Sequence, residues 1–191
     1  MSHDSSGIEQ TSHASRAAGR YASVVPIEYR LAVMDDAEAI RGIYNREVVG
    51  SISTFDLVPR SLEDQQVWID EHSGAHPAIV AVDAGSVAGF GSLTPYRSRP
   101  AYRTTVENSI YVDEEHQGRG IGRGLLEELI RLAGLHGFHA VMARIVGSNE
   151  TSIGLHRSCG FELVGVEREV GRKFARWLDV ALMQRMIDAP R

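Results

Sequence analysis

The sequence predicts an α/β (α+β) domain in which helices cover both faces of a mixed β-sheet. Expected strands and helices follow one another in the order β-α-α-β-β-β-α-β-α-β-β, which is typical of this class. The 191 residues suffice for one well-packed domain, expected over residues 26–188. Hydrophobic residues make up 43% of the chain and charged residues 24%, a balance typical of globular proteins.

The first half of the chain begins with a strand signal at 27–33, where polar and apolar residues alternate. Asp35 or Asp36 can then cap a helix that runs to about Val49. Ala39, Ile43 and Glu47 would lie on its successive turns. Residues 51–59 form a loop with a short extended piece at 53–55.

A second helix is expected to begin after Ser61, because Asp64 stands where the acid of a capping box reaches back. Trp68 and Ile69 would face the core. Two apolar strands at 78–82 and 87–93 follow, joined by a hairpin turn.

The second half of the chain alternates further strands with helices. The expected strands lie at 103–112, 140–146, 161–170 and 177–186, and the expected helices at 120–135 and 149–158. The first of these helices carries Ile121, Leu125, Leu129 and Leu132 on one face. Gly160 is expected to end the second helix.

Composition excludes several classes of protein. The formal charge of −5 provides no basic field that would attract nucleic acid or an anionic membrane. No apolar run approaches the roughly 20 residues that span a bilayer. Residues 1–25 contain no apolar core of a signal peptide, so we expect a disordered leader or a tag remnant. Cys159 is the only cysteine, which fits a reducing, cytoplasmic compartment.

The most informative segment is 110–123, where an apolar strand runs through a glycine-rich turn into an amphipathic helix. Unpaired main-chain amides and the helix dipole at such a turn bind phosphate. Arg119 and Arg123 can add positive charge. A nucleotide-binding P-loop would need a lysine here, and a dinucleotide fold would place its glycines after the first strand. The pyrophosphate of coenzyme A remains, beside the alternative of a glycine-rich loop before an ordinary core helix.

Two motifs resemble the GNAT superfamily of N-acetyltransferases. Gln117-x-x-Gly120-x-Gly122 is similar to its motif A, and the segment 149–161 is similar to its motif B, with His156 in place of the usual tyrosine. The segments 97–112 and 171–180 further resemble the phosphinothricin and methionine sulfoximine acetyltransferase branch. This resemblance implies a mixed, mostly antiparallel central sheet and acetyl-CoA as cosubstrate.

The resemblance also implies a set of cofactor-binding residues. The end of the central strand would bind the acetyl and pantetheine arm, the turn would bind the pyrophosphate, and the motif B helix would contact the arm. These residues are Ile110, Tyr111, Val112, Gly118, Arg119, Gly120, Ile121, Gly122, Arg123, Asn149 and Ser158. Gly118 stands where relatives often carry arginine.

Acetyl transfer to an amine requires a proton acceptor. Glu107, in the central strand near the expected thioester, is the candidate general base, because a partly buried carboxyl group has a raised pKa. The alternative is an exposed strand acid. His156 could relay a proton, or it could instead orient the cofactor or pack in the core. A main-chain N–H near Val112 is the expected oxyanion donor. Cys159 is expected to be a small core residue and not a nucleophile.

The acceptor pocket is expected to contain paired cations. Arg97 and Arg99, two residues apart, would share one face of a strand and bind an anionic amino acid. The alternative is a solvated loop pair. Four further side chains could wall the same pocket, with a place in the core as the alternative for the aromatic ones. They are Phe55, Tyr102, Lys173 and Trp177. The resemblance implies a homodimer in which pocket residues, such as those of the Phe55 loop, are supplied across the interface.

The predicted function is acetyl transfer from acetyl-CoA to the α-amine of a small amino acid or analogue. Two alternatives remain: an acetyltransferase for a polyamine or a protein N-terminus, and a non-catalytic acyl-CoA sensor. The other histidines show no zinc-ligand spacing, so no metal is expected. No nucleic-acid or membrane partner is expected either.

Overall fold

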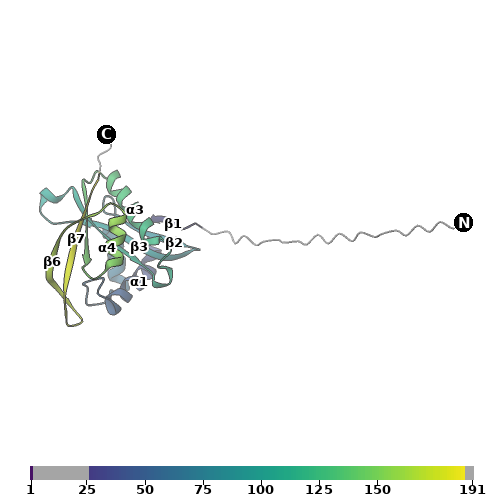
Figure 1. Cartoon of the computed structure of the whole chain (residues 1–191), viewed down its shortest axis with the longest axis horizontal. Helices are drawn as coiled ribbons and strands as arrows, with labels where there is room; N and C mark the ends of the chain where they lie inside the picture. Colours follow the sequence, from purple (N-terminus) through teal and green to yellow (C-terminus); the bar gives the residue numbers. More distant parts are fainter. Residues whose placement is uncertain (2–25, 188–191) are drawn as a thin grey trace.

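The computed structural model describes Met1 and residues 26–187, so the predicted leader lies almost entirely outside the described residues. Within them, seven strands form one sheet in the order β1-β2-β3-β4-β5-β7-β6 (Figure 1). The strands are β1 (Glu28–Leu31), β2 (Ala78–Asp83), β3 (Ser86–Pro95), β4 (Thr105–Val112), β5 (Ala140–Val146), β6 (Glu162–Lys173) and β7 (Arg176–Met186). Only β4 and β5 pair in parallel. The predicted mixed, mostly antiparallel sheet is confirmed.

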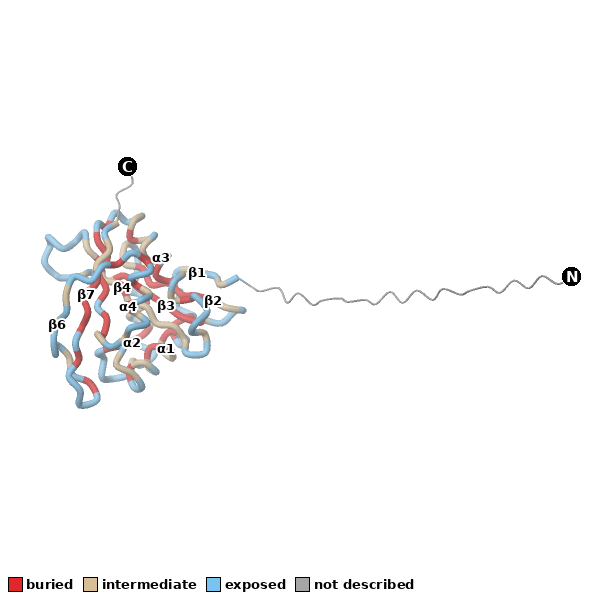
Figure 2. Tube along the Cα trace, viewed as in Figure 1, coloured by how far each residue is buried: buried red, intermediate tan, exposed pale blue. Residues whose placement is uncertain are grey.

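Helices cover both faces of the sheet, as predicted. Helices α1 (Ala37–Gly50) and α2 (Leu62–Glu71) pack on one face, with Val80 and Phe90 of the sheet in their core. The other face is covered by α3 (Ile121–Leu135) and α4 (Glu150–Ser158). Figure 2 shows the buried residues concentrated along the central strands and the inner sides of the helices. Among residues 26–187, no helix combines the length and apolar character needed to cross a bilayer.

Two predicted helix boundaries are confirmed by their local contacts. The Ser61 hydroxyl accepts a hydrogen bond from the Asp64 amide at 3.1 Å, and the Asp64 carboxylate accepts from the Ser61 amide at 3.0 Å. This reciprocal pair is the predicted capping box of α2. After α4, Gly160 adopts φ +82°, a left-handed conformation that stops the helix.

The start of α1 differs from the prediction. Asp36 precedes the helix, but its side chain makes no capping hydrogen bond to it. The carboxylate instead accepts from the Val33 amide at 2.8 Å and pairs with Arg30 at 2.7 and 2.9 Å. An ion pair reinforced by a main-chain hydrogen bond outcompetes the single bond that a cap would give.

Of the residues predicted on successive turns of α1, Ile43 is buried, Glu47 is half-buried and Ala39 is exposed. The buried side chains of α1 lie on a wider face of the helix. They are Ala37, Ile40, Ile43, Tyr44 and Val48. Trp68 of α2 is half-buried, whereas Ile69 is buried as expected.

The segment before β4 is not a strand. β3 ends at Pro95 and β4 begins at Thr105, with a short 3-10 helix at Pro100–Tyr102 between them. The premise that Arg97 and Arg99 share a strand face is therefore wrong, because Pro100 fixes a helical turn there. Residues 53–55 likewise form no strand.

Candidate active site between two diverging strands

The candidate site begins where the two parallel strands separate. β4 and β5 pair at only three positions, the last being Glu107 opposite Met142. At the next residue, the Asn108 side-chain amide donates to the Met142 carbonyl at 2.9 Å and so takes the place of a ladder bond. β5 continues to pair with β7 as far as Val146. The β5-facing edge of β4 after Asn108 therefore has no strand partner, and its main-chain groups are available to a ligand.

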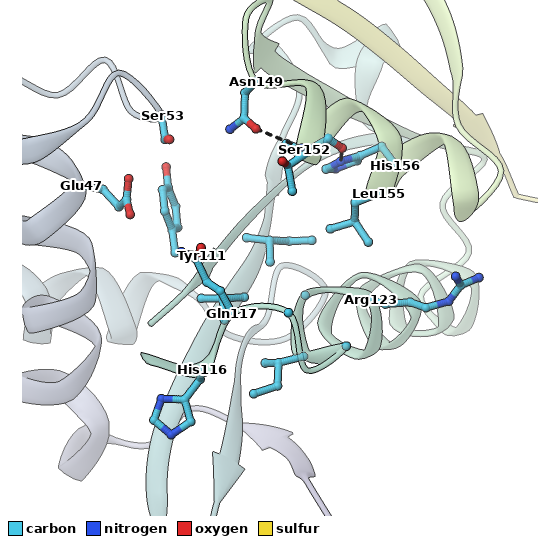
Figure 3. Close-up of a pocket in the computed structure, with 17 residues that line it drawn as sticks. Glu47, Ser53, Tyr111, His116, Gln117, Arg123, Asn149, Ser152, Leu155 and His156 are labelled. Carbon is cyan, nitrogen blue, oxygen red and sulfur yellow. Dashed lines mark hydrogen bonds between the residues drawn. The ribbon is translucent and has the colours of Figure 1, made fainter. Parts of the chain in front are cut away.

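A cavity of about 560 Å³ opens beyond this separation, between the end of β4, the glycine-rich turn and α4 (Figure 3). Nine of the residues predicted to bind the cofactor line it. They are Ile110, Tyr111, Val112, Gly118, Gly120, Ile121, Gly122, Arg123 and Asn149. A smaller cavity of about 80 Å³ lies in the gap between β4 and β5 and shares Ser53, Asn149 and His156 with the larger one.

The glycine-rich turn presents bare main chain to the large cavity. Gly118 and Gly120 have φ values of +74° and +81°, which side chains other than glycine rarely adopt. Gly120 occupies the N-cap position of α3, and no side chain caps the helix. The first amides of α3 are therefore unpaired, and the helix dipole adds partial positive charge. This arrangement can bind a phosphate group.

The two predicted phosphate-binding arginines are placed differently. Arg123 lines the large cavity, but its guanidinium extends away from the centre in Figure 3. There it pairs with Glu127 at 2.8 Å. Arg119 does not line the cavity and pairs with Asp83 of β2 at 2.6 Å. Ser158 also lies outside the lining, with its hydroxyl donating to the Leu155 carbonyl at 2.7 Å.

The start of α4 brings Asn149 and His156 to the cavity wall. The Asn149 side chain accepts from the Ser152 amide at 3.0 Å and caps the helix. His156 is only 3% exposed. Its Nδ1 lies 2.8 Å from the Ser152 carbonyl, to which it must donate, and its Nε2 lies 3.1 Å from Oδ1 of Asn108. Each ring nitrogen thus faces an acceptor oxygen, and a neutral ring can donate to only one of the two.

Burial lowers the pKa of the His156 imidazole, and the hydrogen bond to Ser152 opposes this shift. The ring also meets Phe161 edge-on at 5.0 Å between centroids. These contacts fix the orientation of the ring, whereas burial favours its neutral form.

Glu107 lies on β4 just before the strands separate. It is half-buried, and this burial raises the pKa of its carboxyl group. The positive charges of Arg144 and Arg97 lower that pKa, whereas the negative charge of Glu167 raises it. Glu107 shares its strand face with Ser109 and Tyr111, which line the cavities, but it does not itself line them. It therefore lies beside the cavity wall.

The α1 side of the cavity is built around a pair of tyrosines. The Tyr44 ring meets Tyr111 edge-on at 5.1 Å between centroids, and the Tyr44 hydroxyl donates to Asp56 at 2.6 Å. The same hydroxyl lies 2.9 Å from Oγ1 of Thr54. Burial raises the pKa of both phenols, so they remain neutral hydrogen-bonding groups.

The residues predicted for the acceptor pocket are not gathered in one cavity. Arg97 is exposed, and its guanidinium donates to the Tyr96 hydroxyl at 3.3 Å and lies 5.6 Å from the centroid of Tyr102. Arg99 is exposed in the following loop. Trp177 is exposed on β7, with Arg172 over its ring at 5.3 Å. Phe55 and Lys173 contact each other's segments and not an open cavity.

Several residues that line the large cavity were not predicted. They are Glu47, Ser53, His116, Gln117, Thr151, Ser152 and Leu155. Gln117, Ser152 and Leu155 lie inside the two recognised motifs, so their positions carried a usable signal. Glu47 and Ser53 reach the site through tertiary packing and carried none. Among the described residues, no group of three or more His, Cys, Asp or Glu side chains is arranged to hold a metal ion.

Comparison with known proteins agrees with this geometry. Residues 37–161 match the Acetyltransferase (GNAT) family. The L-methionine sulfoximine/L-methionine sulfone acetyltransferase of Pseudomonas aeruginosa is 40% identical over 164 residues, covering 85% of this chain and 95% of that protein.

Two solved structures are similar as well. A phosphinothricin acetyltransferase from Sinorhizobium meliloti, in complex with acetyl-CoA, has a TM-score of 0.81 and 39% identity, covering 84% of this chain and 88% of its own. A ribosomal-protein-alanine N-acetyltransferase from Brucella melitensis has a TM-score of 0.82 and 38% identity, covering 83% and 99%. The chain therefore belongs to the GNAT family and is an N-acetyltransferase, as its motifs predicted.

Proposed function

We propose that this enzyme transfers the acetyl group of acetyl-CoA to the α-amine of a small amino acid or analogue, of the phosphinothricin or methionine sulfoximine type. The observation that carries this proposal is the gap after Asn108, which leads from the unpaired edge of β4 to the glycine turn at the head of α3. Its relatives from Pseudomonas aeruginosa and Sinorhizobium meliloti are named for such acceptors.

Acetyl-CoA would lie along the large cavity. The amides that follow Gly118 and Gly120 would bind its pyrophosphate, and Arg123 would add charge by turning inward from Glu127. The main chain of 110–112 would hold the pantetheine arm in the place of a β5 strand. Arg119 would act at longer range, because Asp83 already holds it.

Glu107 would accept the proton that the amine must lose before it attacks. Its raised pKa makes it a better proton acceptor than an exposed glutamate. Because Glu107 lies beside the cavity lining, the proton would reach it through an intervening water. A main-chain N–H of β4 near Val112 would donate to the thioester oxygen.

His156 would act by position more than by proton transfer. Each of its nitrogens faces an acceptor oxygen of the protein, and the contact with Asn108 links α4 to β4. We infer that it keeps the gap at the width the pantetheine arm needs. A proton relay through this ring would require it to leave one of these two contacts first.

The acceptor would enter from the α1 side, where Ser53 and Glu47 line the large cavity. Arg97 would bind an anionic end of the acceptor, since its charge already acts on Glu107. Tyr102 would then form a side wall beside Arg97. Arg99 has no contact that ties it to the site, and its role stays a prediction.

Acetylation of a protein N-terminus is a second candidate, because the Brucella melitensis relative is named for it. Such a substrate would need an open groove for its following residues. A thiol-release assay with a panel of free amino acids and an alanine-terminated peptide separates the two functions.

We also propose a cytoplasmic homodimer. Leu163, Val164 and Val166 of the edge strand β6 are exposed, as are Phe174 and Trp177 around the β6–β7 turn, and an exposed apolar edge of this kind is typical of an interface. Cys159 is buried and unpaired, as expected in a reducing compartment. Sedimentation equilibrium tests the dimer; a monomer at micromolar concentration would contradict it.

The test of the function is a thiol-release assay with acetyl-CoA and a panel of acceptors. The panel contains phosphinothricin, methionine sulfoximine, methionine sulfone, the free amino acids, a polyamine and an alanine-terminated peptide. Turnover is expected with one or more amino acids or analogues. Turnover with the peptide or the polyamine alone would overturn the acceptor assignment, and binding of acetyl-CoA without any turnover would favour the sensor.

A further inference from the structure

Lys173 is the only lysine of the chain; all other members of the 20 Lys and Arg residues are arginine. It ends β6 and is only 3% exposed. Buried lysines are rare because the ammonium group must exchange water for other hydrogen-bond partners. Its partners therefore indicate what the residue does.

The ammonium group joins the end of α1 to the segment that follows it. Nζ donates to the Thr54 carbonyl at 2.9 Å and to the Glu47 carbonyl at 3.4 Å. Glu47 lies in the last turn of α1, where the helix dipole favours a cation. A compact ammonium with three donors suits two converging carbonyl groups better than a planar guanidinium does.

A second contact with β6 holds the same segment, and it is made by Gly171, two residues before Lys173. A Cβ atom at Gly171 would overlap the Phe55 ring, so this ring lies directly against the main chain of β6. Residues 171 and 173 are two apart on a strand and face the same side. Thr54 and Phe55 are thus held by neighbouring points of one strand of the same chain.

The opposite side of the segment is fastened to α1. The Thr54 hydroxyl meets the Tyr44 hydroxyl at 2.9 Å, and the Ser51 amide donates to the Glu47 carbonyl at 3.1 Å. Ser53 lies between these fixed points and lines both cavities of the site. Its position at the cavity wall therefore depends on contacts made by residues on either side of it.

We propose that Lys173, with Gly171, is a positioning residue that clamps residues 51–56, the acceptor-side segment, and thereby sets how acceptors fit. This inference deepens the proposed function and rests on it. The competing role is direct binding of the acceptor's anionic end. Against that role, the Lys173 side chain lines neither cavity of the site and its ammonium already has two carbonyl partners.

Acceptor charge distinguishes the two roles. Phosphinothricin carries a negative side chain, whereas the methionine sulfone side chain is uncharged. Lys173→Met keeps an unbranched side chain, shorter by the ammonium group alone, and loses its donors. The clamp predicts that KM rises by the same factor for both acceptors, about tenfold to a hundredfold, because a misplaced wall affects any acceptor. The acetyl-CoA dissociation constant, measured by calorimetry, should change by less than about twofold, since the pyrophosphate turn is untouched. A KM that rises for phosphinothricin alone would overturn the clamp, and so would an unchanged KM for both.

A second experiment needs no acceptor. Because the chain has one lysine, Lys173 and the N-terminal amine are the only amines that acetic anhydride can acylate, and mass spectrometry resolves the acylated sites. In the native enzyme Lys173 should react far more slowly than in urea. Gly171→Ala pushes the Phe55 ring away and should speed its acylation on the order of tenfold through local opening. Gly165→Ala is the matched control on β6, because its added Cβ meets nothing within 4 Å.

The outcomes of this acylation experiment, the footprint, are distinct from those of the thiol-release assay that tests the function. Equal acylation of Lys173 in native and urea-treated protein would overturn the clamp, and so would equal rates in Gly165→Ala and Gly171→Ala. Because the footprint uses neither acetyl-CoA nor acceptor, it reports on the clamp even if Lys173→Met does not fold. If the unmodified enzyme acetylated no member of the panel, the proposed function would fail while the footprint could still succeed.

Discussion

Replacing Glu107 by Gln removes the proposed base and keeps its shape. A positioned general base contributes about 10²- to 10⁴-fold to a rate, so kcat should fall by that factor at pH 7.5. Acetyl-CoA affinity should stay within about twofold, because Glu107 lies outside the cavity lining. The thiol-release assay gives kcat, and calorimetry gives the affinity.

The pH dependence of kcat/KM gives the same variant a second readout. Both the acceptor amine and Glu107 must lose a proton before reaction. In a plot of log(kcat/KM) against pH, the acidic limb of the unmodified enzyme should therefore approach a slope of about 2, and that of Glu107→Gln a slope of about 1. Arg144 lowers the pKa of Glu107, so Arg144→Met should move the limb to higher pH. Glu167 raises it, so Glu167→Gln should move the limb to lower pH.

Stability should respond in the opposite sense to activity. The folded-state pKa of Glu107 is raised, so its stabilising contribution is present at low pH and lost as the pH rises through that value. Glu107→Gln should therefore melt no lower than the unmodified enzyme at pH 7.5. Glu162→Gln, an exposed position on β6, is the control and should change neither property. Equal rates in Glu107→Gln and the unmodified enzyme would refute the assignment of Glu107 as the base. So would an acidic limb of the pH profile that does not move in Arg144→Met or Glu167→Gln.

The remaining predictions concern α4 and the glycine turn. The pKa of folded His156 is lowered, so its stabilisation is present above about pH 6.5 and lost as the pH falls. His156→Gln should thus cost about 1–3 kcal/mol at pH 7.5 and less at pH 5 in urea unfolding; an equal cost at both would contradict this. Gly120→Ala should lower the free energy of unfolding by about 1–2 kcal/mol, because alanine disfavours the positive φ at this position. It should also weaken the binding of acetyl-CoA, measured by calorimetry. Gly154→Ala, in open space within α4, is the control and should raise the free energy of unfolding by about 0.5–1 kcal/mol with unchanged acetyl-CoA affinity. If Gly154→Ala also lost stability and acetyl-CoA affinity, the effect of Gly120→Ala would not be specific to the turn.

Local signals predicted much of the fold. The capping box at Ser61 and Asp64, the apolar face of α3 and the glycine after α4 each act within a few residues, so the sequence displays them directly. The glycine turn was predictable for the same reason, because strand, turn and helix are contiguous. These elements also carry the motifs from which the family was inferred.

The predictions that failed concern local patterns that are compatible with more than one partner or conformation. Asp36 looks like a helix cap, but the Arg30 guanidinium and the Val33 amide bind it more strongly than a capping contact would. Arg97 and Arg99 fit an alternating pattern, yet Pro100 begins a helical turn there. A short pattern cannot show which of two local conformations the surrounding structure selects.

The acceptor side of the site was the least predictable part. Lys173 contacts Thr54 and Glu47, which lie 119 and 126 positions before it in the sequence. No spacing rule relates such separations in sequence to a role. Ser53 and Glu47 reach the cavity through tertiary packing, Glu47 from the last turn of α1 and Ser53 from the segment that follows it. Sequence patterns thus located the proposed cofactor half of the site, which is formed mainly by two short motifs, better than the proposed acceptor half.

Hydrogen exchange with and without acetyl-CoA tests the central claim most directly. If the cosubstrate replaces the missing strand beside β4, amides of 108–112 and 118–123 should exchange more slowly in its presence, while those of β1 and β2 stay unchanged. Unchanged exchange in both segments at saturating acetyl-CoA, or protection confined to other parts of the sheet, would contradict the account.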